Sequence, residues 1–304
     1  TVAQLANLVI GAGAQRERSS IILIRKGTGS TNIFFVHPAG GNIMSYYDLS
    51  EALPEEYNVY GLQSTFANDN ITTIEETATI YLKEIEDTIS EGKLVFGGWS
   101  MGALIAFEMA KQFYNKNEKN IPVILLDQKA PARYDQEKTK PIGRLERLSV
   151  FGGKTDHIVG ENTLLNKENL EPLSESERTA LFLQEFKKYN LVPEGAQTTD
   201  FQVFLDRMML HNDMAIDYRT KSFKGKYLLI KANDSTFVTD EFENDACYGW
   251  RFYTENEVNI KGVNGNHITI MKSPFNKEVS KAIHTFLQSA LVDNLITQES
   301  AVTV

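Results

Sequence analysis

The pentapeptide at positions 98–102 reads Gly-Trp-Ser-Met-Gly and matches the pattern G-x-S-x-G, with Ser100 at its centre. An apolar run at 94–97 precedes it, and a helical pattern of apolar residues follows at 101–113. A sharp turn between a buried strand and a helix forces strained backbone angles on such a serine and lifts its hydroxyl out of the sheet. The helix N-terminus beneath the hydroxyl favours developing negative charge. The pattern therefore predicts that Ser100 is a nucleophile that forms an acyl-enzyme intermediate.

A base must remove the proton of the serine, because a hydroxyl alone is a poor nucleophile. In α/β-hydrolases the triad follows the chain order serine, acid, histidine. His267 fits this order, since it ends a turn-rich loop at 262–267 that lies between a strand signal near Val258 and the final helical pattern. We predict that His267 is the base. The other histidines lie in less suitable segments; they are His37, His157, His211 and His284.

Two aspartates are candidates for the acid that orients the histidine and stabilises its charged form. Asp127 directly follows the apolar run at 123–126, and Asp234 follows the run at 227–230. Most aspartates after strands only cap a turn or a helix, and the residues alone leave the choice between these two open.

Two backbone N–H groups must converge on one point to hold the oxyanion of a tetrahedral intermediate. The Met101 N–H, directly after the nucleophile, is the first predicted donor. The second is expected from the small-residue loop at 37–41, where we predict the Ala39 N–H. The two glycines of this loop do not form the dinucleotide pattern G-x-G-x-x-G, which argues against a Rossmann cofactor site. We expect no directly bound cofactor.

Apolar runs and helical patterns alternate along the chain, which indicates βαβ units and a mostly parallel, twisted sheet flanked by helices. Capping-box spacings that begin at Thr73 and Ser174 predict two helix starts, and a final helix is expected at about 276–291. The expected strands lie at 21–24, 33–36, 57–61, 94–98, 123–126, 227–230 and 258–260.

Between about 128 and 224 the patterns are helical only, with helices expected from about 174 to 189 and from about 200 to 218. A helical block inserted into such a sheet is typical of a lid over the site. The chain thus predicts an α/β-hydrolase fold at 21–292, with a lid at about 128–224 and a tail at 293–304. The apolar residues of the lid are expected either to pack internally or to line a substrate wall; they include Phe182, Phe186, Phe201, Phe204, Met208 and Met209.

The charge and composition limit the range of partners. Lys and Arg number 31 against 40 Asp and Glu, which gives a net charge of −9 and no support for nucleic-acid binding. No apolar run is long enough to span a bilayer, and the start of the chain lacks a signal-peptide pattern. Cys247 is the only cysteine, and no His, Asp and Glu cluster has metal-ligand spacing. We expect a cytoplasmic protein with no metal site and no membrane partner.

Together these segments resemble the type I thioesterase domains that end nonribosomal peptide synthetases and polyketide synthases. The resemblance covers nearly the whole chain, with one departure at Ala103, where many members have a third glycine. It rests on the segments VHPAGG at 36–41, YGLQ at 60–63, GGWSMG with AFEMA at 97–110, LLDQKAP at 125–131 and GNH with Met271 at 265–271.

The resemblance implies that Asp127 is the acid, because these domains usually take it from the strand after the helix that follows the serine. It also implies that an acyl or peptidyl chain arrives as a thioester on the phosphopantetheine of an upstream carrier domain. Release would then proceed by hydrolysis or by macrocyclisation. Residues 1–20 are similar to the last helix of such a carrier domain followed by a linker.

Three other functions share part of this pattern. A stand-alone proofreading thioesterase would have the triad without the carrier-like start, and a carboxylesterase or lipase would prefer oxygen esters. A non-catalytic binding module would keep the sheet but would not need a serine, an acid and a histidine in this order. Loss of activity in Ser100→Ala would distinguish an enzyme from such a module.

Overall fold

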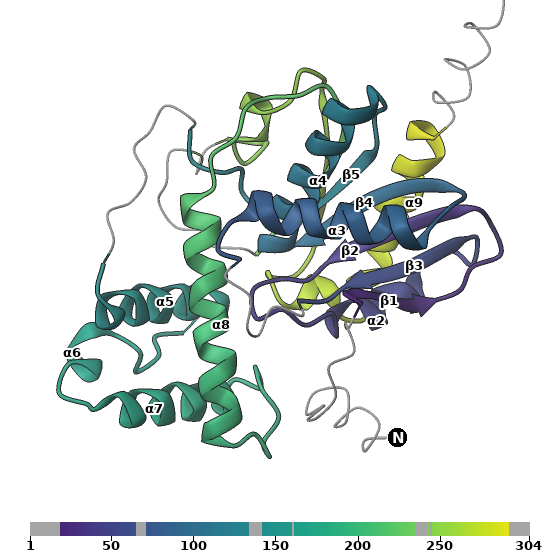
Figure 1. Cartoon of the computed structure of the whole chain (residues 1–304). Coiled ribbons are helices and arrows are strands. Elements are labelled where there is room, and N and C mark those ends of the chain that lie inside the picture. Colours follow the sequence, from purple (N-terminus) through teal and green to yellow (C-terminus); the bar gives the residue numbers. More distant parts are fainter. Residues whose placement is uncertain are drawn as a thin grey trace, which may run out of the picture.

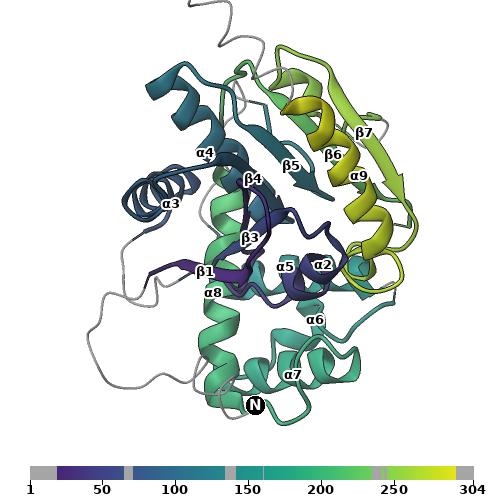
Figure 2. The ribbon, with the colours of Figure 1, turned by 90° about the vertical axis from the view of Figure 1, so that its right-hand side faces the viewer.

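A seven-stranded sheet forms the centre of the computed structural model, which describes residues 19–64, 71–133, 142–159, 161–234, 242 and 245–291. The strand order is β1-β3-β2-β4-β5-β6-β7, with β1 to β5 labelled in Figure 1 and β6 and β7 in Figure 2. β1 runs antiparallel to β3, and the other neighbouring pairs are parallel. The strands are β1 (Ile21–Arg25), β2 (Thr31–Val36), β3 (Tyr57–Leu62), β4 (Lys93–Trp99), β5 (Pro122–Leu126), β6 (Lys226–Ala232) and β7 (Val258–Val263).

Helices cover both faces of the sheet, which explains why the central strands are apolar throughout rather than alternating. α3 and α4 pack on one face and α2 and α9 on the other (Figure 2). At the start of α3, the Thr73 hydroxyl accepts a hydrogen bond from the Glu76 N–H at 3.2 Å. The helices of this part are α2 (Ser45–Ala52), α3 (Ile74–Thr88), α4 (Met101–Asn117) and α9 (Asn276–Ala290), with short 3-10 turns η1 (Trp250–Phe252) and η2 (Thr269–Met271).

Among the described residues between β5 and β6, four further helices form the inserted region, called the lid below. They are α5 (Arg144–Val159), α6 (Lys167–Leu170), α7 (Glu175–Lys188) and α8 (Thr198–Asp217). The lid has an apolar core of its own, separate from the two cores against the sheet. Of the predicted apolar residues, Phe182, Phe186, Phe201 and Met209 are buried in that core, so internal packing accounts for them.

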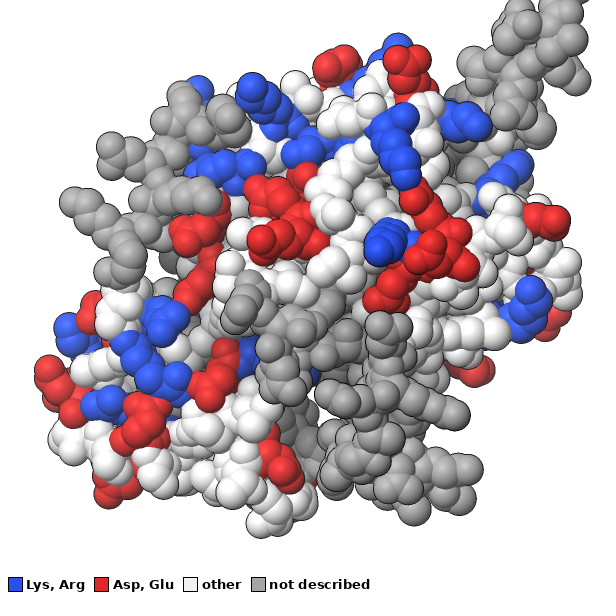
Figure 3. Space-filling view, in the orientation of Figure 1, with Lys and Arg blue, Asp and Glu red and all other residues white. Residues whose placement is uncertain are grey.

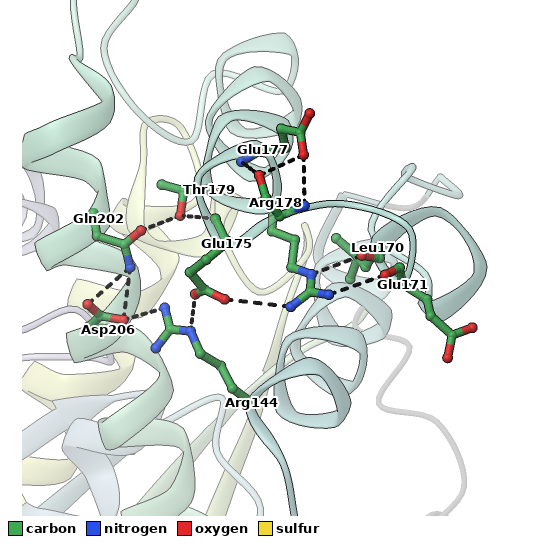
Figure 4. A network of polar contacts seen from close by, with 10 residues as sticks. Arg144, Leu170, Glu171, Glu175, Glu177, Arg178, Thr179, Gln202 and Asp206 are labelled. Carbon is green, nitrogen blue, oxygen red and sulfur yellow. Dashed lines mark hydrogen bonds and ion pairs between the residues drawn. The ribbon is translucent and has the colours of Figure 1, made fainter.

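A polar network on the lid surface joins its helices to one another (Figure 4). Arg144 of α5 forms ion pairs with Glu175 of α7 and with Asp206 of α8. Arg178 of α7 donates to the backbone carbonyl of Leu170 in α6 at 2.9 Å. The packed core and these cross-links indicate that α5 to α8 hold together as one unit.

The structure confirms the α/β-hydrolase fold and each predicted strand, with bounds that differ by a few residues. The two capping boxes differ in detail: at Ser174 both reciprocal bonds are present, while at Thr73 only the side-chain cap is formed. In the described part of 128–224, the only strand-like pairing is a single bridge from Phe223 to Thr254. The predicted carrier-like helix within 1–20 and the tail at 293–304 fall almost wholly outside the described residues.

The face of the molecule seen in Figure 1 carries acidic and basic side chains side by side (Figure 3). Several of the acidic groups come from α3, whose sequence has five Glu and Asp residues against one Lys.

Among the helices of the described residues, none is both long enough and apolar enough to cross a membrane.

Candidate active site

Ser100 lies at the turn between β4 and α4 in a strained conformation, with φ 56° and ψ −135°. Positive φ is uncommon outside glycine and marks strain that the surrounding structure must maintain. The Ser100 N–H donates to the Leu126 carbonyl of β5 at 3.1 Å, which fixes the turn against the sheet. The hydroxyl therefore stands above the sheet at the N-terminus of α4, as the sequence pattern predicts.

The two glycines around Ser100 allow close approaches that no side chain would tolerate. A Cβ on Gly98 would lie 2.1 Å from the backbone of Gly102, and a Cβ on Gly102 would lie 2.2 Å from the Val36 carbonyl oxygen. Both distances are far below van der Waals contact, so the turn can form only with glycine at each position. The G-x-S-x-G pattern is thus a packing requirement of this turn.

His267 and Asp127 meet, although 140 positions separate them in the chain. The His267 Nδ1 lies 2.8 Å from the Asp127 Oδ2. Asp127 is fully buried, and its other carboxylate oxygen accepts from the Ala232 N–H at 2.8 Å. When the Nδ1–H donates to this carboxylate, the Nε2 of His267 carries the lone pair that a general base needs.

The loop that carries His267 is held on both sides. Asn266 accepts with its side-chain oxygen from the backbone N–H groups of Ile268 and Thr269, at 3.0 and 2.9 Å. Trp99, the residue before Ser100, donates its indole N–H to the His267 carbonyl at 3.0 Å. The indole and imidazole rings lie 5.0 Å apart. Trp99 thus places the histidine loop beside the turn of the nucleophile.

The structure separates the two candidate acids. Asp234 is exposed, and its backbone N–H donates to the Gly265 carbonyl at 3.0 Å, which ties the end of β6 to the loop before His267. Asp127 has a positive φ of 46°, and its N–H donates to Ile230 at 2.7 Å. That conformation directs the Asp127 carboxylate toward His267, while Asp234 holds the loop before His267 through a hydrogen bond of its backbone N–H.

The loop at 37–41 starts beside the turn of Ser100, because Val36 of β2 pairs with Gly98 of β4. Gly40 and Gly41 have positive φ values of 91° and 84°, and the Gly41 N–H closes a turn onto the Pro38 carbonyl at 3.1 Å. Within the described part of the chain, neither the Ala39 N–H nor the Met101 N–H has a hydrogen-bond acceptor. Both donors remain available, which is what an oxyanion hole requires.

Tyr46 joins the two segments of the site and was not identified from the sequence. Its buried hydroxyl accepts from the Trp99 N–H at 2.8 Å and donates to the Val36 carbonyl at 2.5 Å. Burial raises the pKa of this phenol, so the hydroxyl keeps the proton that it donates. Tyr46 bridges β2 and β4 at the end of their pairing, where the oxyanion loop and the nucleophile turn diverge.

Tyr46→Phe is expected to lower the free energy of unfolding by about 2 kcal/mol, because it leaves a buried N–H and a buried carbonyl unpaired. It should also lower kcat by about tenfold, since the two segments lose their shared support. Urea unfolding and steady-state kinetics measure both effects. Tyr47→Phe, at the adjacent exposed position, should change neither by more than about 0.5 kcal/mol. Equal behaviour of the two variants would contradict this role of Tyr46.

His37 and His211 stack on each other beside the oxyanion loop, with ring centroids 5.0 Å apart. Both are buried. Burial lowers the pKa of His37 to about 4, and burial with the neighbouring His37 and Arg207 lowers the pKa of His211 to about 2. Both imidazoles therefore stay neutral in the folded protein at neutral pH.

The folded protein is expected to lose stability as the pH falls from about 6.5 to about 4. In this window the unfolded chain binds a proton at position 37 and the folded protein does not. The free energy of unfolding should then fall by as much as about 1.4 kcal/mol per pH unit from this histidine alone. Urea unfolding of the wild type and of His37→Asn across this range tests the point. A pH dependence that the substitution leaves unchanged would refute it.

Among the described residues, no group of three or more His, Cys, Asp and Glu side chains is placed to hold a metal ion. The described side chains at this site can act as an acid, a base and a nucleophile. The arrangement of Ser100, His267 and Asp127 suits acyl transfer through a covalent intermediate.

Known proteins resemble this chain in sequence and in fold. A non-reducing polyketide synthase of Pseudevernia furfuracea is 26% identical over 290 residues, which are 90% of this chain and 13% of that protein. A dimodular nonribosomal peptide synthase of Bacillus subtilis (strain 168) is 24% identical over 88% of this chain and 11% of its own length. The chain therefore spans about an eighth of the length of these relatives.

Solved structures agree in fold. The four-domain nonribosomal peptide synthetase AB3403, bound to AMP and glycine, matches 94% of this chain with 21% of its own, at a TM-score of 0.76 and 24% identity. The NocB thioesterase domain in covalent complex with a fluorophosphonate nocardicin G analogue matches 88% of this chain with 100% of its own, at a TM-score of 0.62 and 18% identity. The family model for the thioesterase domain matches residues 31–287. The chain belongs to the thioesterase domain family.

Proposed function

We propose that this chain releases a finished acyl or peptidyl chain from a carrier domain, through an ester on Ser100. The observation that carries the proposal is the buried pair of His267 and Asp127 beside the strained turn of Ser100. The relatives are polyketide and nonribosomal peptide synthases, which supports a thioester substrate held on the phosphopantetheine of a carrier. The carrier domain is the expected partner, and the similarity of residues 1–20 to the end of such a domain supports this.

The first half of the reaction transfers the acyl group to the enzyme. The His267 Nε2 removes the proton from the Ser100 hydroxyl while its oxygen attacks the thioester carbonyl carbon. The carbonyl electrons move to the oxygen, and the Ala39 and Met101 N–H groups hold the resulting oxyanion. The intermediate collapses, the carbon–sulfur bond breaks, and the departing pantetheine thiolate takes the proton from His267. Asp127 stabilises the imidazolium throughout.

The second half returns the serine. A water molecule, or an amine or hydroxyl of the acyl chain itself, gives its proton to His267 and attacks the Ser100 ester. The same two N–H groups hold the second oxyanion, and Ser100 leaves with the proton from His267. Water yields a free acid, and an internal nucleophile yields a macrocycle. The lid favours the macrocycle to the extent that it excludes water from the ester.

Turnover of a carrier-bound thioester against a matched oxygen ester tests this function. The substrates are acyl chains from acetyl to dodecanoyl, attached to a phosphopantetheinylated carrier protein, to free pantetheine and to ethanol. The expected result is faster release from the thioesters, with kcat/KM highest for the carrier-bound form. Mass spectrometry of the product identifies the free acid, and a 12-hydroxydodecanoyl chain in the same panel, which carries an internal hydroxyl, tests whether a ring is formed. Turnover of ethyl esters alone would favour the carboxylesterase alternative and would contradict the proposal.

A further inference from the structure

One face of the lid helix α8 lies against the oxyanion loop at 37–41. Phe204, Arg207, Met208 and His211 follow one another at the spacing i, i+3, i+4, i+7 and so share that face. A Cβ on Gly40 would lie 2.8 Å from both the Phe204 ring and the Met208 sulfur, and a Cβ on Gly41 would lie 3.0 Å from the Arg207 side chain. The helix therefore covers the loop in direct contact.

His211 makes the one polar bond found in the described residues between this face of α8 and the backbone of the loop. The Gly40 N–H donates to the His211 Nδ1 at 3.2 Å, in a buried environment. An Nδ1 that accepts a hydrogen bond must carry a lone pair instead of a proton, so the imidazole is neutral with its proton on Nε2. Gly40 follows Ala39, whose N–H is one of the two predicted oxyanion donors.

The surroundings of His211 favour this neutral form. His37 from the loop and Arg207 from α8 are the titratable or charged groups that act on it, and Tyr81 of α3 contacts the His37 ring. His37 uses its Nδ1–H on the Pro38 carbonyl at 2.8 Å, and its buried Nε2 has no hydrogen-bond partner in the described part of the chain. A positive charge on His211 would be buried beside the Arg207 guanidinium, which disfavours it. His211 can therefore act as a permanent acceptor.

α8 is also anchored to the body of the enzyme beyond His211. The Tyr218 hydroxyl, at its C-terminal end, donates to the buried Glu108 carboxylate of α4 at 2.5 Å. At its N-terminal half, Phe201 and Leu205 belong to the lid core. His211 lies between these two attachments, where the lid and the catalytic loop meet.

We propose that His211 is a positioning residue for the oxyanion hole, through which the lid helix α8 fixes the loop that carries the Ala39 N–H. The inference rests on the proposed function, because only in that reaction does the Ala39 N–H stabilise an oxyanion. The Gly40–His211 bond then couples the position of the lid helix to the position of the Ala39 N–H. A lid that lifts from the loop releases Gly40 and displaces the adjacent donor.

Two substitutions at His211 distinguish the effect of its hydrogen-bond acceptor from the effect of its ring. His211→Phe keeps a stacking ring and removes the acceptor, while His211→Asn keeps an oxygen near the Nδ1 position and removes the ring. The Phe variant is expected to lower kcat for acyl-pantetheine thioesters by about 10- to 100-fold with KM nearly unchanged, since a displaced donor affects the transition state alone. The Asn variant should recover to within about fivefold of wild type. His284→Phe, at a histidine on α9 that contacts Tyr57, is the matched control and should retain full kcat.

Equal losses in the two His211 variants, or full activity in His211→Phe, would overturn the inference. Imidazole ¹⁵N spectra of the wild type test the inference independently of whether a variant folds. In these spectra His211 should be neutral at pH 5 with its proton on Nε2. A charged ring or an Nδ1–H form would overturn it as well. If no acyl-pantetheine from acetyl to dodecanoyl acylates the wild type, the proposed function itself fails. Wild-type acylation together with an unaffected Phe variant removes only the role of His211.

Discussion

His267→Ala is expected to lower kcat for acyl-thioester turnover by about 10⁵- to 10⁶-fold, close to the full loss from removing a serine nucleophile. Without the imidazole, no group removes the proton of Ser100 or returns it to the leaving thiol. The effect should fall on kcat with little change in KM, because substrate binding does not use the imidazole. Single-turnover acylation, followed by intact mass, measures the chemical step directly.

The control for this variant is His284→Ala, which removes a histidine of α9 that forms a hydrogen bond with the Tyr57 hydroxyl. Its kcat should stay within about twofold of wild type. Circular dichroism should show both variants folded, since the His267 ring lies in a loop and α9 keeps its core contacts. A His267→Ala enzyme with more than about one hundredth of wild-type kcat would show that another group acts as the base.

Asp127→Asn is the second large prediction, with kcat expected to fall by about 10⁴-fold. The amide nitrogen of Asn can donate to the His267 Nδ1, which moves the ring proton to Nε2 and leaves no lone pair toward Ser100. The remaining amide oxygen can still accept from the Ala232 N–H, so the fold should survive. The loss of kcat is therefore caused by the wrong tautomer of His267 and the missing negative charge at position 127, and not by a change in the fold.

The matched control is Asp234→Asn, the same substitution at the aspartate that the sequence alone could not exclude. Asp234 is exposed and contributes its backbone N–H to Gly265, so its variant should keep kcat within about twofold of wild type. The comparison is made at equal enzyme and substrate concentrations. A larger loss in Asp234→Asn than in Asp127→Asn would reverse the assignment of the acid.

Local sequence signals were enough for the parts of the site that depend on local geometry. Ser100 follows from two glycines and a strand-to-helix transition, and the structure shows that backbone contact demands those glycines. His267 follows from its loop between the last strand and the last helix. The choice between Asp127 and Asp234 needed the family resemblance, because both follow parallel strands and their contacts depend on how the loops fold.

Other features depend on contacts that no local pattern records. Tyr46 lies 53 positions from Trp99, and His211 lies 171 positions from Gly40, so neither bond leaves a signal in the surrounding residues. α2 has only eight residues, too few for a clear amphipathic pattern, and was not predicted. α5 was missed because Gly152 and Gly153 lower the helix propensity in its middle.

The contacts of the lid are likewise only partly predictable from local sequence patterns. Its capping box at Ser174 marks the start of α7 correctly, and its apolar residues are partitioned in a way that only the fold reveals. Phe182, Phe186, Phe201 and Met209 are buried inside the lid, while Phe204 and Met208 pack against the edge of that core and also lie close to Gly40 of the oxyanion loop. Periodicity alone does not distinguish an internal face from one that meets another domain surface.

The covalent intermediate on Ser100 can be observed in the intact mass of the wild type and of Ser100→Ala after brief exposure to the acyl-pantetheine panel. The predicted result is a mass increase equal to one acyl group in the wild type only, with the modified peptide mapped to Ser100. That outcome would establish the covalent intermediate on which the triad, the oxyanion loop and the role of His211 all depend. An equal mass increase in Ser100→Ala, or turnover of the panel by that variant at the wild-type rate, would contradict it.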